Sequence, residues 1–116
     1  MDYEPIVSNL AQQVFDALAP RITPEDMERV RKAYLLAKEA HAPQKRKSGE
    51  PYILHPIAVA LIVAKELQLD ANTVITAFLH DVVEDTPYTV DDIRERFGND
   101  VAGLVNVVTK QKKEIY

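Results

Sequence analysis

The chain of 116 residues has no cysteine, only 3 glycines and no apolar run long enough to cross a bilayer. Without cysteine there can be no disulfides and no thiolate metal ligands, so any metal must be bound by histidine and carboxylate groups. The longest apolar run, Ile57 to Ala64, is far shorter than the roughly 20 residues of a membrane-spanning helix. The first residues also lack the basic and apolar segments of a secretory signal. These absences predict a soluble, cytoplasmic protein without a membrane anchor.

The charge balance contains no excess of basic residues. Asp and Glu number 18 against 14 Lys and Arg, which gives a net charge of −4. We therefore expect no direct binding of nucleic acid by this segment, although a local basic patch is compatible with the balance. The length predicts a single domain, residues 1–116, that is large enough to bury one core.

The apolar spacing is helical along the whole chain, and no convincing strand period appears. Thr23, Asp70 and Thr89 stand at positions typical of helix N-caps, and Thr89 with Asp92 resembles a capping box. The segment near 55–67 is apolar on almost every side, so we expect it at the centre of a bundle. The fold class predicted is all-α, with helices at about 6–18, 24–41, 55–67, 71–85, 90–97 and 100–110.

The sequence His80-Asp81-Val82-Val83-Glu84-Asp85-Thr86 is the most informative feature of the chain. On a helix, Glu84 lies one turn after His80, and Asp85 lies one turn after Asp81. This places four groups that bind divalent cations or transfer protons at the end of an apolar helix. A solvated acidic helix end with an incidental histidine is the alternative. We favour a ligand role for His80 and Asp81, provided that the ion lies between the directions of their side chains.

The other histidines are weaker candidates. His55 precedes Pro56 at an expected helix start, where a neutral imidazole able to bind metal is favoured over a cation. A capping or core role for His55 is equally compatible with this position. His41 ends an apolar stripe and is interpreted as a packing residue.

Glu84 and Asp85 could position water or accept its proton beside a metal, or they could simply be solvated at the helix end. The basic segment Lys45-Arg46-Lys47-Ser48 is compatible with an ordinary solvated loop. Its nearness to His55 favours a second interpretation. A polyphosphate substrate needs cations at one end and a metal at the scissile phosphorus.

Two longer stretches resemble the signatures of the RelA/SpoT enzymes, which make and degrade the alarmone (p)ppGpp. One runs from Arg46 through Gly49 and Tyr52 to Pro56, and the other is the segment from His80 to Thr86. Phe97-Gly98 and Val107-Val108-Thr109-Lys110 follow in the expected order. The resemblance covers about Arg29 to Lys110 and implies an HD-type helical hydrolase domain.

The resemblance also implies a Mn²⁺-dependent reaction that removes the 3′ pyrophosphate of (p)ppGpp, giving GDP or GTP. By this resemblance His55, His80 and Asp81 are metal ligands for one ion. Glu84 and Asp85 would be the catalytic carboxylates. Arg46, Lys47 and Ser48 would bind the guanine nucleotide.

The family's fourth metal ligand is an Asp in a later motif, which we expect beyond residue 116. We therefore expect a partial bundle that lacks the domain's C-terminal helices, binds metal weakly and has little or no activity. We also expect self-association through an uncovered apolar face. Alternatives are an HD phosphohydrolase of another nucleotide, or a non-catalytic HD domain that regulates an attached (p)ppGpp synthetase. The intact His-Asp motif argues against the latter.

Overall fold

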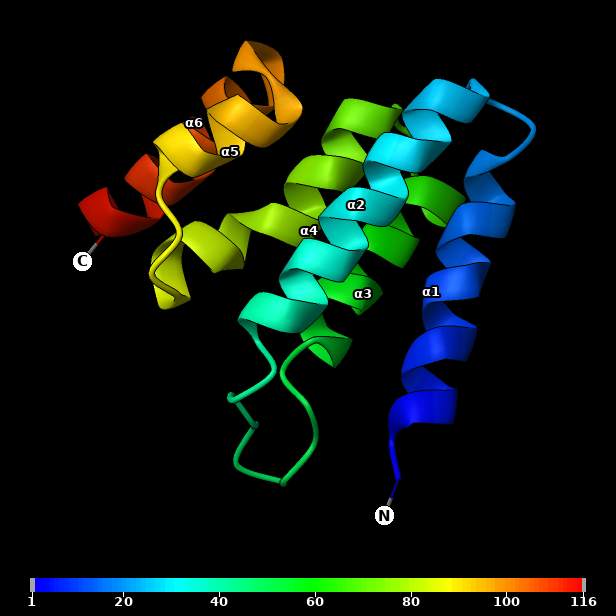
Figure 1. Cartoon of the computed structure of the whole chain (residues 1–116), viewed down its shortest axis with the longest axis horizontal. Coiled ribbons are helices and arrows are strands. Elements are labelled where there is room, and N and C mark those ends of the chain that lie inside the picture. The colour runs from blue at the N-terminus through cyan, green and yellow to red at the C-terminus, as the bar shows by residue number, and fades with distance from the viewer. Residues whose placement is uncertain (1, 116) are drawn as a thin grey trace.

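Figure 1 shows the computed structural model of the chain, which describes residues 2–115 and the side chains of residues 2–109. Within these residues no strand forms, and a single isolated β-bridge joins Lys45 to Pro51. The predicted all-α class is confirmed. The elements in chain order are α1 (Glu4–Leu18), α2 (Pro24–Ala40), α3 (Leu54–Leu61), the π-helical segment η1 (Ile62–Glu66), α4 (Ala71–Asp85), α5 (Val90–Phe97) and α6 (Asn99–Ile115).

The helix starts depend on local hydrogen bonds that the sequence predicted. Thr23 accepts a hydrogen bond from the backbone N–H of Asp26, and Asp70 accepts one from Thr73 at 2.9 Å. These bonds satisfy donors in the first turn that have no partner within the helix. The expected N-caps are therefore confirmed at both helices.

The short helix α5 shows both predicted end signals. Thr89 and Asp92 exchange the reciprocal bonds of a capping box. At the other end, Gly98 has a φ of 96°, a conformation that glycine adopts without strain. The chain then turns directly into α6, so that α5 and α6 pack against one another at one side of the molecule (Figure 1).

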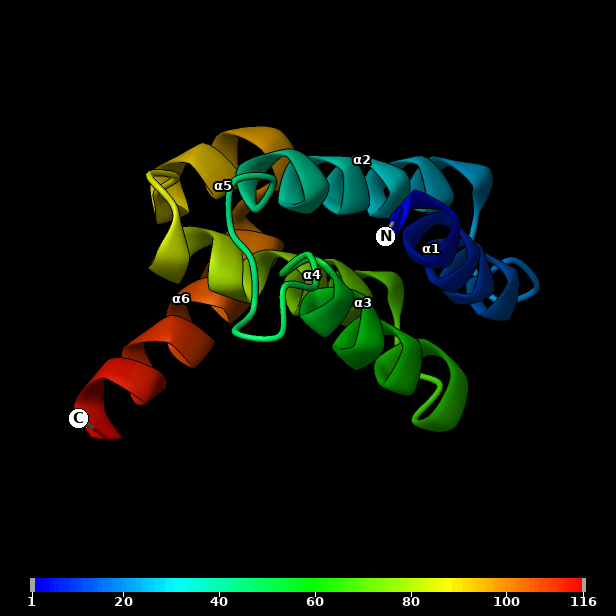
Figure 2. The ribbon, with the colours of Figure 1, turned by 90° about the horizontal axis from the view of Figure 1, so that it is seen from below.

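Helix α4 lies at the centre of the fold. It packs against α2, α3 and α6, and Figure 2 shows it on the side of α2 that faces α3. Because it has neighbours on several sides, most of its large apolar side chains are completely buried. They are Val74, Ile75, Phe78, Leu79 and Val82.

The prediction that the apolar segment 55–67 is central was wrong. Helix α3 packs against α1 and α4, but Ile62 and Leu67 are exposed. The α-helix becomes the π-helical turn η1 at Ile62, and Arg21 donates hydrogen bonds to the carbonyls of Ala64 and Leu69 at 2.6 and 3.2 Å. The apolar sequence therefore covers one side of a peripheral helix and extends to its exposed end.

Helix α6 extends beyond the predicted end at Lys110 and is buried on only part of its predicted apolar side. Val101 and Val105 are fully buried, whereas Leu104 and Val108 are exposed. Among the described residues, none of the helices has the length and apolar character needed to cross a membrane.

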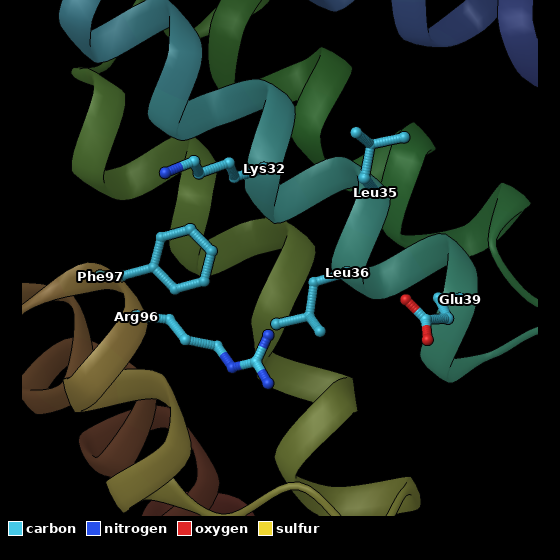
Figure 3. Close-up of a pocket in the computed structure, with 6 residues that line it drawn as sticks. All are labelled: Lys32, Leu35, Leu36, Glu39, Arg96 and Phe97. Carbon is cyan, nitrogen blue, oxygen red and sulfur yellow. The ribbon is translucent and has the colours of Figure 1, made fainter.

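A groove of about 400 Å³ lies between α2 and α5, and Figure 3 shows the side chains that line it. Its wall contains Leu36, Phe97 and Lys32, and the guanidinium of Arg96 extends from α5 toward Leu36 (Figure 3). None of the predicted site residues lines this groove. The candidate site lies elsewhere, at the C-terminal end of α4.

Candidate active site

Two helices bring the predicted metal ligands together. His80 and Asp81 lie in the last two turns of α4, after the buried apolar part of that helix, and His55 is the second residue of α3. The side chain of Asp81 is 1% exposed, that of His80 16% and that of His55 43%. The cluster therefore has a buried carboxylate at its base and an imidazole open to solvent at its rim.

The three side chains are close enough to share one ion. One ligand atom from each of His55, His80 and Asp81 lies within 4.8 Å of the other two. His80 Nε2 is 3.2 Å from Asp81 Oδ1, and His55 Nε2 is 3.6 Å from Asp81 Oδ2. Adjacent residues on a helix thus converge with a third group from another helix, as the sequence required for a shared ion.

The hydrogen bonds of His80 fit a metal ligand. Its Nδ1 lies 2.9 Å from the carbonyl oxygen of Ala77, which can only accept, so Nδ1 carries the proton. In a neutral imidazole the Nε2 lone pair then faces the carboxylate of Asp81. Two acceptors at this distance repel one another unless a proton or a cation lies between them. The donor set therefore suits a divalent cation that histidine and carboxylate can bind.

Asp85 is attached to the cluster through Tyr52. The Tyr52 hydroxyl donates to Asp81 Oδ2 at 3.0 Å and lies 3.5 Å from Asp85 Oδ2. The side-chain amide of Gln44 donates to the backbone carbonyl of Asp85 at 2.7 Å. Glu84 precedes Asp85 on the last turn of α4 and is partly buried. Both predicted carboxylates therefore lie on the helix end that carries the metal ligands.

The predicted basic loop forms a closed turn beside this cluster. The backbone N–H of Arg46 donates to the carbonyl of Glu50 at 2.9 Å, and that of Gly49 donates to Arg46 at 2.8 Å. Gly49 has a φ of 90°, which glycine adopts readily. The exposed loop residues surround an open concavity of about 650 Å³ with Tyr52 on its wall. The lining residues are Lys45, Arg46, Lys47, Ser48, Glu50 and Tyr52.

Tyr52 and Gln44, for which the sequence predicted no role, connect the loop to the cluster. Burial and then the hydrogen bond to Asp81 raise the pKa of Tyr52 above its ordinary value of 10.0, so its hydroxyl remains a proton donor. Tyr52 lies inside the Arg46-to-Pro56 signature, which was the available signal. His41 is 1% exposed, which agrees with its interpretation as a packing residue, and its Nδ1 lies 2.9 Å from Gln44 Oε1.

Residues 33–114 match the family described as HD domain. The chain is 55% identical over 91 residues to the bifunctional (p)ppGpp synthase/hydrolase SpoT of Escherichia coli. The aligned region is 78% of this chain and 13% of that protein. It is 54% identical over 93 residues to the guanosine-3′,5′-bis(diphosphate) 3′-pyrophosphohydrolase of Aquifex aeolicus, covering 80% of this chain and again 13% of the relative. The chain thus spans about an eighth of the length of these curated relatives.

A GTP pyrophosphokinase of Streptomyces coelicolor is 42% identical over 111 residues, covering 96% of this chain and 13% of that protein. A solved structure described as a metazoan ortholog of SpoT that hydrolyses ppGpp superposes with a TM-score of 0.67 at 37% identity. The superposition covers 70% of this chain and 47% of that one.

Proposed function

The chain belongs to the HD domain family, and on that basis we propose that it hydrolyses (p)ppGpp at the 3′ position with Mn²⁺. The names of the relatives support this substrate, since they include (p)ppGpp hydrolases from Escherichia coli and Aquifex aeolicus. We also propose that the reaction takes place in the cytoplasm. The observation that carries the proposal is the convergence of His55, His80 and Asp81 within 4.8 Å, beside the basic loop.

In this proposal His55 Nε2, His80 Nε2 and an Asp81 oxygen would hold the ion. When bound, a divalent cation supplies Lewis-acid polarisation of a phosphoryl oxygen. The hydrogen bond that His80 Nδ1 donates to the carbonyl of Ala77 keeps Nε2 of the same ring available as a ligand. The burial of Asp81 keeps its negative charge effective, because little water screens it.

Glu84 and Asp85 are proposed as the groups that orient the attacking water and accept its proton. The water oxygen forms a bond to the phosphorus attached to the 3′ oxygen, and the bond from that phosphorus to the 3′ oxygen breaks. The proton moves to a carboxylate and then to the leaving 3′ oxygen. The products are pyrophosphate and GDP or GTP.

Arg46, Lys47 and Ser48 are proposed to bind the nucleotide. The planar guanidinium of Arg46 can stack on a base or donate two bonds to a phosphate, whereas Lys47 provides a compact charge. The Ser48 hydroxyl can donate or accept. All three are exposed on the loop, so a ligand can reach them without a rearrangement of the core.

The test is Mn²⁺-dependent release of pyrophosphate from ppGpp by the chain, measured beside His80→Ala. Because three protein ligands are expected to hold the ion weakly, we expect only slow release by the native chain. Release by the variant should be lower still, at the level without Mn²⁺, because mutation at a metal ligand removes the bound ion. Circular dichroism of the variant checks that it is folded. Release that is equal in both proteins, or that persists after chelation, would contradict the proposal.

A further inference from the structure

We propose that Tyr52 is a positioning residue whose hydroxyl fixes the carboxylates of Asp81 and Asp85 relative to one another. The inference rests on the proposed function for the roles of these two acids. In this role the Tyr52 side chain connects the proposed metal ligand Asp81 to the proposed proton acceptor Asp85.

The two carboxylate oxygens of Asp81 have different neighbours, and the Tyr52 hydroxyl binds only one of them. It donates to Oδ2 at 3.0 Å, while Oδ1 lies 3.2 Å from His80 Nε2. A phenolic hydroxyl has one proton, so the longer 3.5 Å approach to Asp85 Oδ2 is a weaker or alternating bond. Holding Oδ2 in this way fixes the plane of the Asp81 carboxylate and directs its other oxygen toward His80.

The Tyr52 ring is itself packed between His41, which lies outside the ligand set, and the proposed ligand His55. Its centroid lies 4.7 Å from that of the buried His41 ring and 5.9 Å from that of His55. The backbone N–H of Tyr52 donates to the carbonyl of Gln44 at 3.2 Å. Since both the ring and the backbone are restrained, the hydroxyl has a defined position before any ligand binds.

Gln44 provides a second attachment to the same helix end. Its amide nitrogen donates to the Asp85 carbonyl, and its amide oxygen accepts from His41 Nδ1. Asp85 is thus held at its backbone by Gln44 and at its side chain by Tyr52. The base of the basic loop and the end of α4 therefore form one unit, in which the orientation of the acids depends on the loop.

Hydrogen bonds from neighbouring groups orient metal ligands, and their loss typically weakens metal affinity by about 10-fold to 100-fold. The experiment is a titration of the native chain and Tyr52→Phe with Mn²⁺, with free ion measured by its electron paramagnetic resonance signal. Phenylalanine keeps the ring between His41 and His55, so circular dichroism should be unchanged. We expect Mn²⁺ to bind at least about 10-fold more weakly to the variant.

Tyr88→Phe is the matched control, because it removes the hydroxyl of a tyrosine whose ring contacts the guanidinium of Arg96. Its Mn²⁺ affinity should equal that of the native chain. Equal affinity in Tyr52→Phe would overturn the proposal. A raised KM for ppGpp with unchanged Mn²⁺ affinity would also overturn it, since Tyr52 would then act only as a substrate contact in the loop.

The two proposals can fail separately. Weaker Mn²⁺ binding by Tyr52→Phe, together with release of pyrophosphate that is equal in the native chain and His80→Ala, would support the positioning role and reject the proposed function. If the native chain hydrolyses ppGpp and Tyr52→Phe binds Mn²⁺ with the native affinity, the proposed function is supported and the positioning role is rejected.

Discussion

At the scale of single residues, Asp81 has an environment that a folded protein rarely gives to a carboxylate. Its side chain is 1% exposed and lies beside the imidazoles of His55 and His80. A buried charge is costly unless protons, hydrogen bonds or a cation compensate it. The stability of the folded chain should therefore depend on what occupies the space between these three groups.

We expect Mn²⁺ to raise the melting temperature of the native chain. An ion that binds only the folded state adds about 2.7 kcal/mol at 100 times its dissociation constant. Asp81→Asn should abolish most of this increase, because the amide removes the negative charge at the base of the cluster. Thermal unfolding followed by circular dichroism, with and without Mn²⁺, measures the effect.

Asp16→Asn on α1 is the control, since it removes a carboxylate whose Oδ1 accepts from Gln12 far from the ligands. It should retain the increase. An equal Mn²⁺ effect in Asp81→Asn would show that the ion binds elsewhere.

The sequence predicted the candidate ligands but not the contacts that orient them. His80 and Asp81 are adjacent on one helix, so the sequence predicted that they lie close together, but adjacent side chains point about 100° apart and spacing alone did not establish that they converge. Gln44 and Asp85 are 41 residues apart, and Tyr52 and Asp81 are 29 apart. Such contacts depend on how the loop folds against α4, which no local pattern encodes.

At the scale of the helices, the N-caps were predictable because their partners lie three residues away. Asp70 is the clearest case, since the hydrogen bond from the Thr73 side chain, followed by that from its backbone, lowers the Asp70 pKa from 3.8. The placement of α3 was not predictable. Apolar composition alone does not tell which neighbours a helix has, and in the fold α4 holds the central place.

Asp70→Ala should lower the free energy of unfolding by about 1 kcal/mol at neutral pH, the usual cost of losing a cap. The charged form is favoured in the folded state, so its contribution is present above the unfolded pKa and is lost as pH falls through the lower folded pKa. The difference in the free energy of unfolding between the native chain and Asp70→Ala should therefore become smaller below about pH 4. Urea unfolding at several pH values measures it.

Asp70→Asn is the matched control, because asparagine also caps helices well but carries no charge. It should keep most of the stability at neutral pH and show less change at acid pH than the native chain. An Asp70→Ala effect that grows with acidity would contradict this account.

At the scale of the whole molecule, the core is organised around α4 and the aromatic side chains that contact it. Phe78 is fully buried, and its ring centroid lies 5.9 Å from that of Tyr34 on α2. Phe78→Ala should cost about 3–5 kcal/mol through lost burial and the cavity left behind. That is a large part of the total stability of a domain, so urea unfolding should show a much lower midpoint. A loss below 1 kcal/mol would contradict this.

The expected self-association remains a prediction. Leu104, Val107 and Val108 are 42%, 53% and 41% exposed, and their spacing of three and four residues places them on one side of α6. Contiguous exposed apolar side chains favour association. Sedimentation velocity should show that the average mass of the native chain rises with protein concentration. The Val107→Lys variant should remain a monomer. Leu35→Lys, on α2, is the control. A monomer at all concentrations would contradict the expectation.

The closed turn of the basic loop has a consequence for the thermodynamics of binding. The Lys45–Pro51 bridge and the backbone bonds of Arg46 restrict the chain before a ligand arrives. Ordering a flexible backbone costs about 1–2 kcal/mol per residue, so a restrained loop loses less conformational entropy when an anion binds. Association should then be limited mainly by diffusion and by attraction between charges. Its rate constant should fall steeply as ionic strength rises.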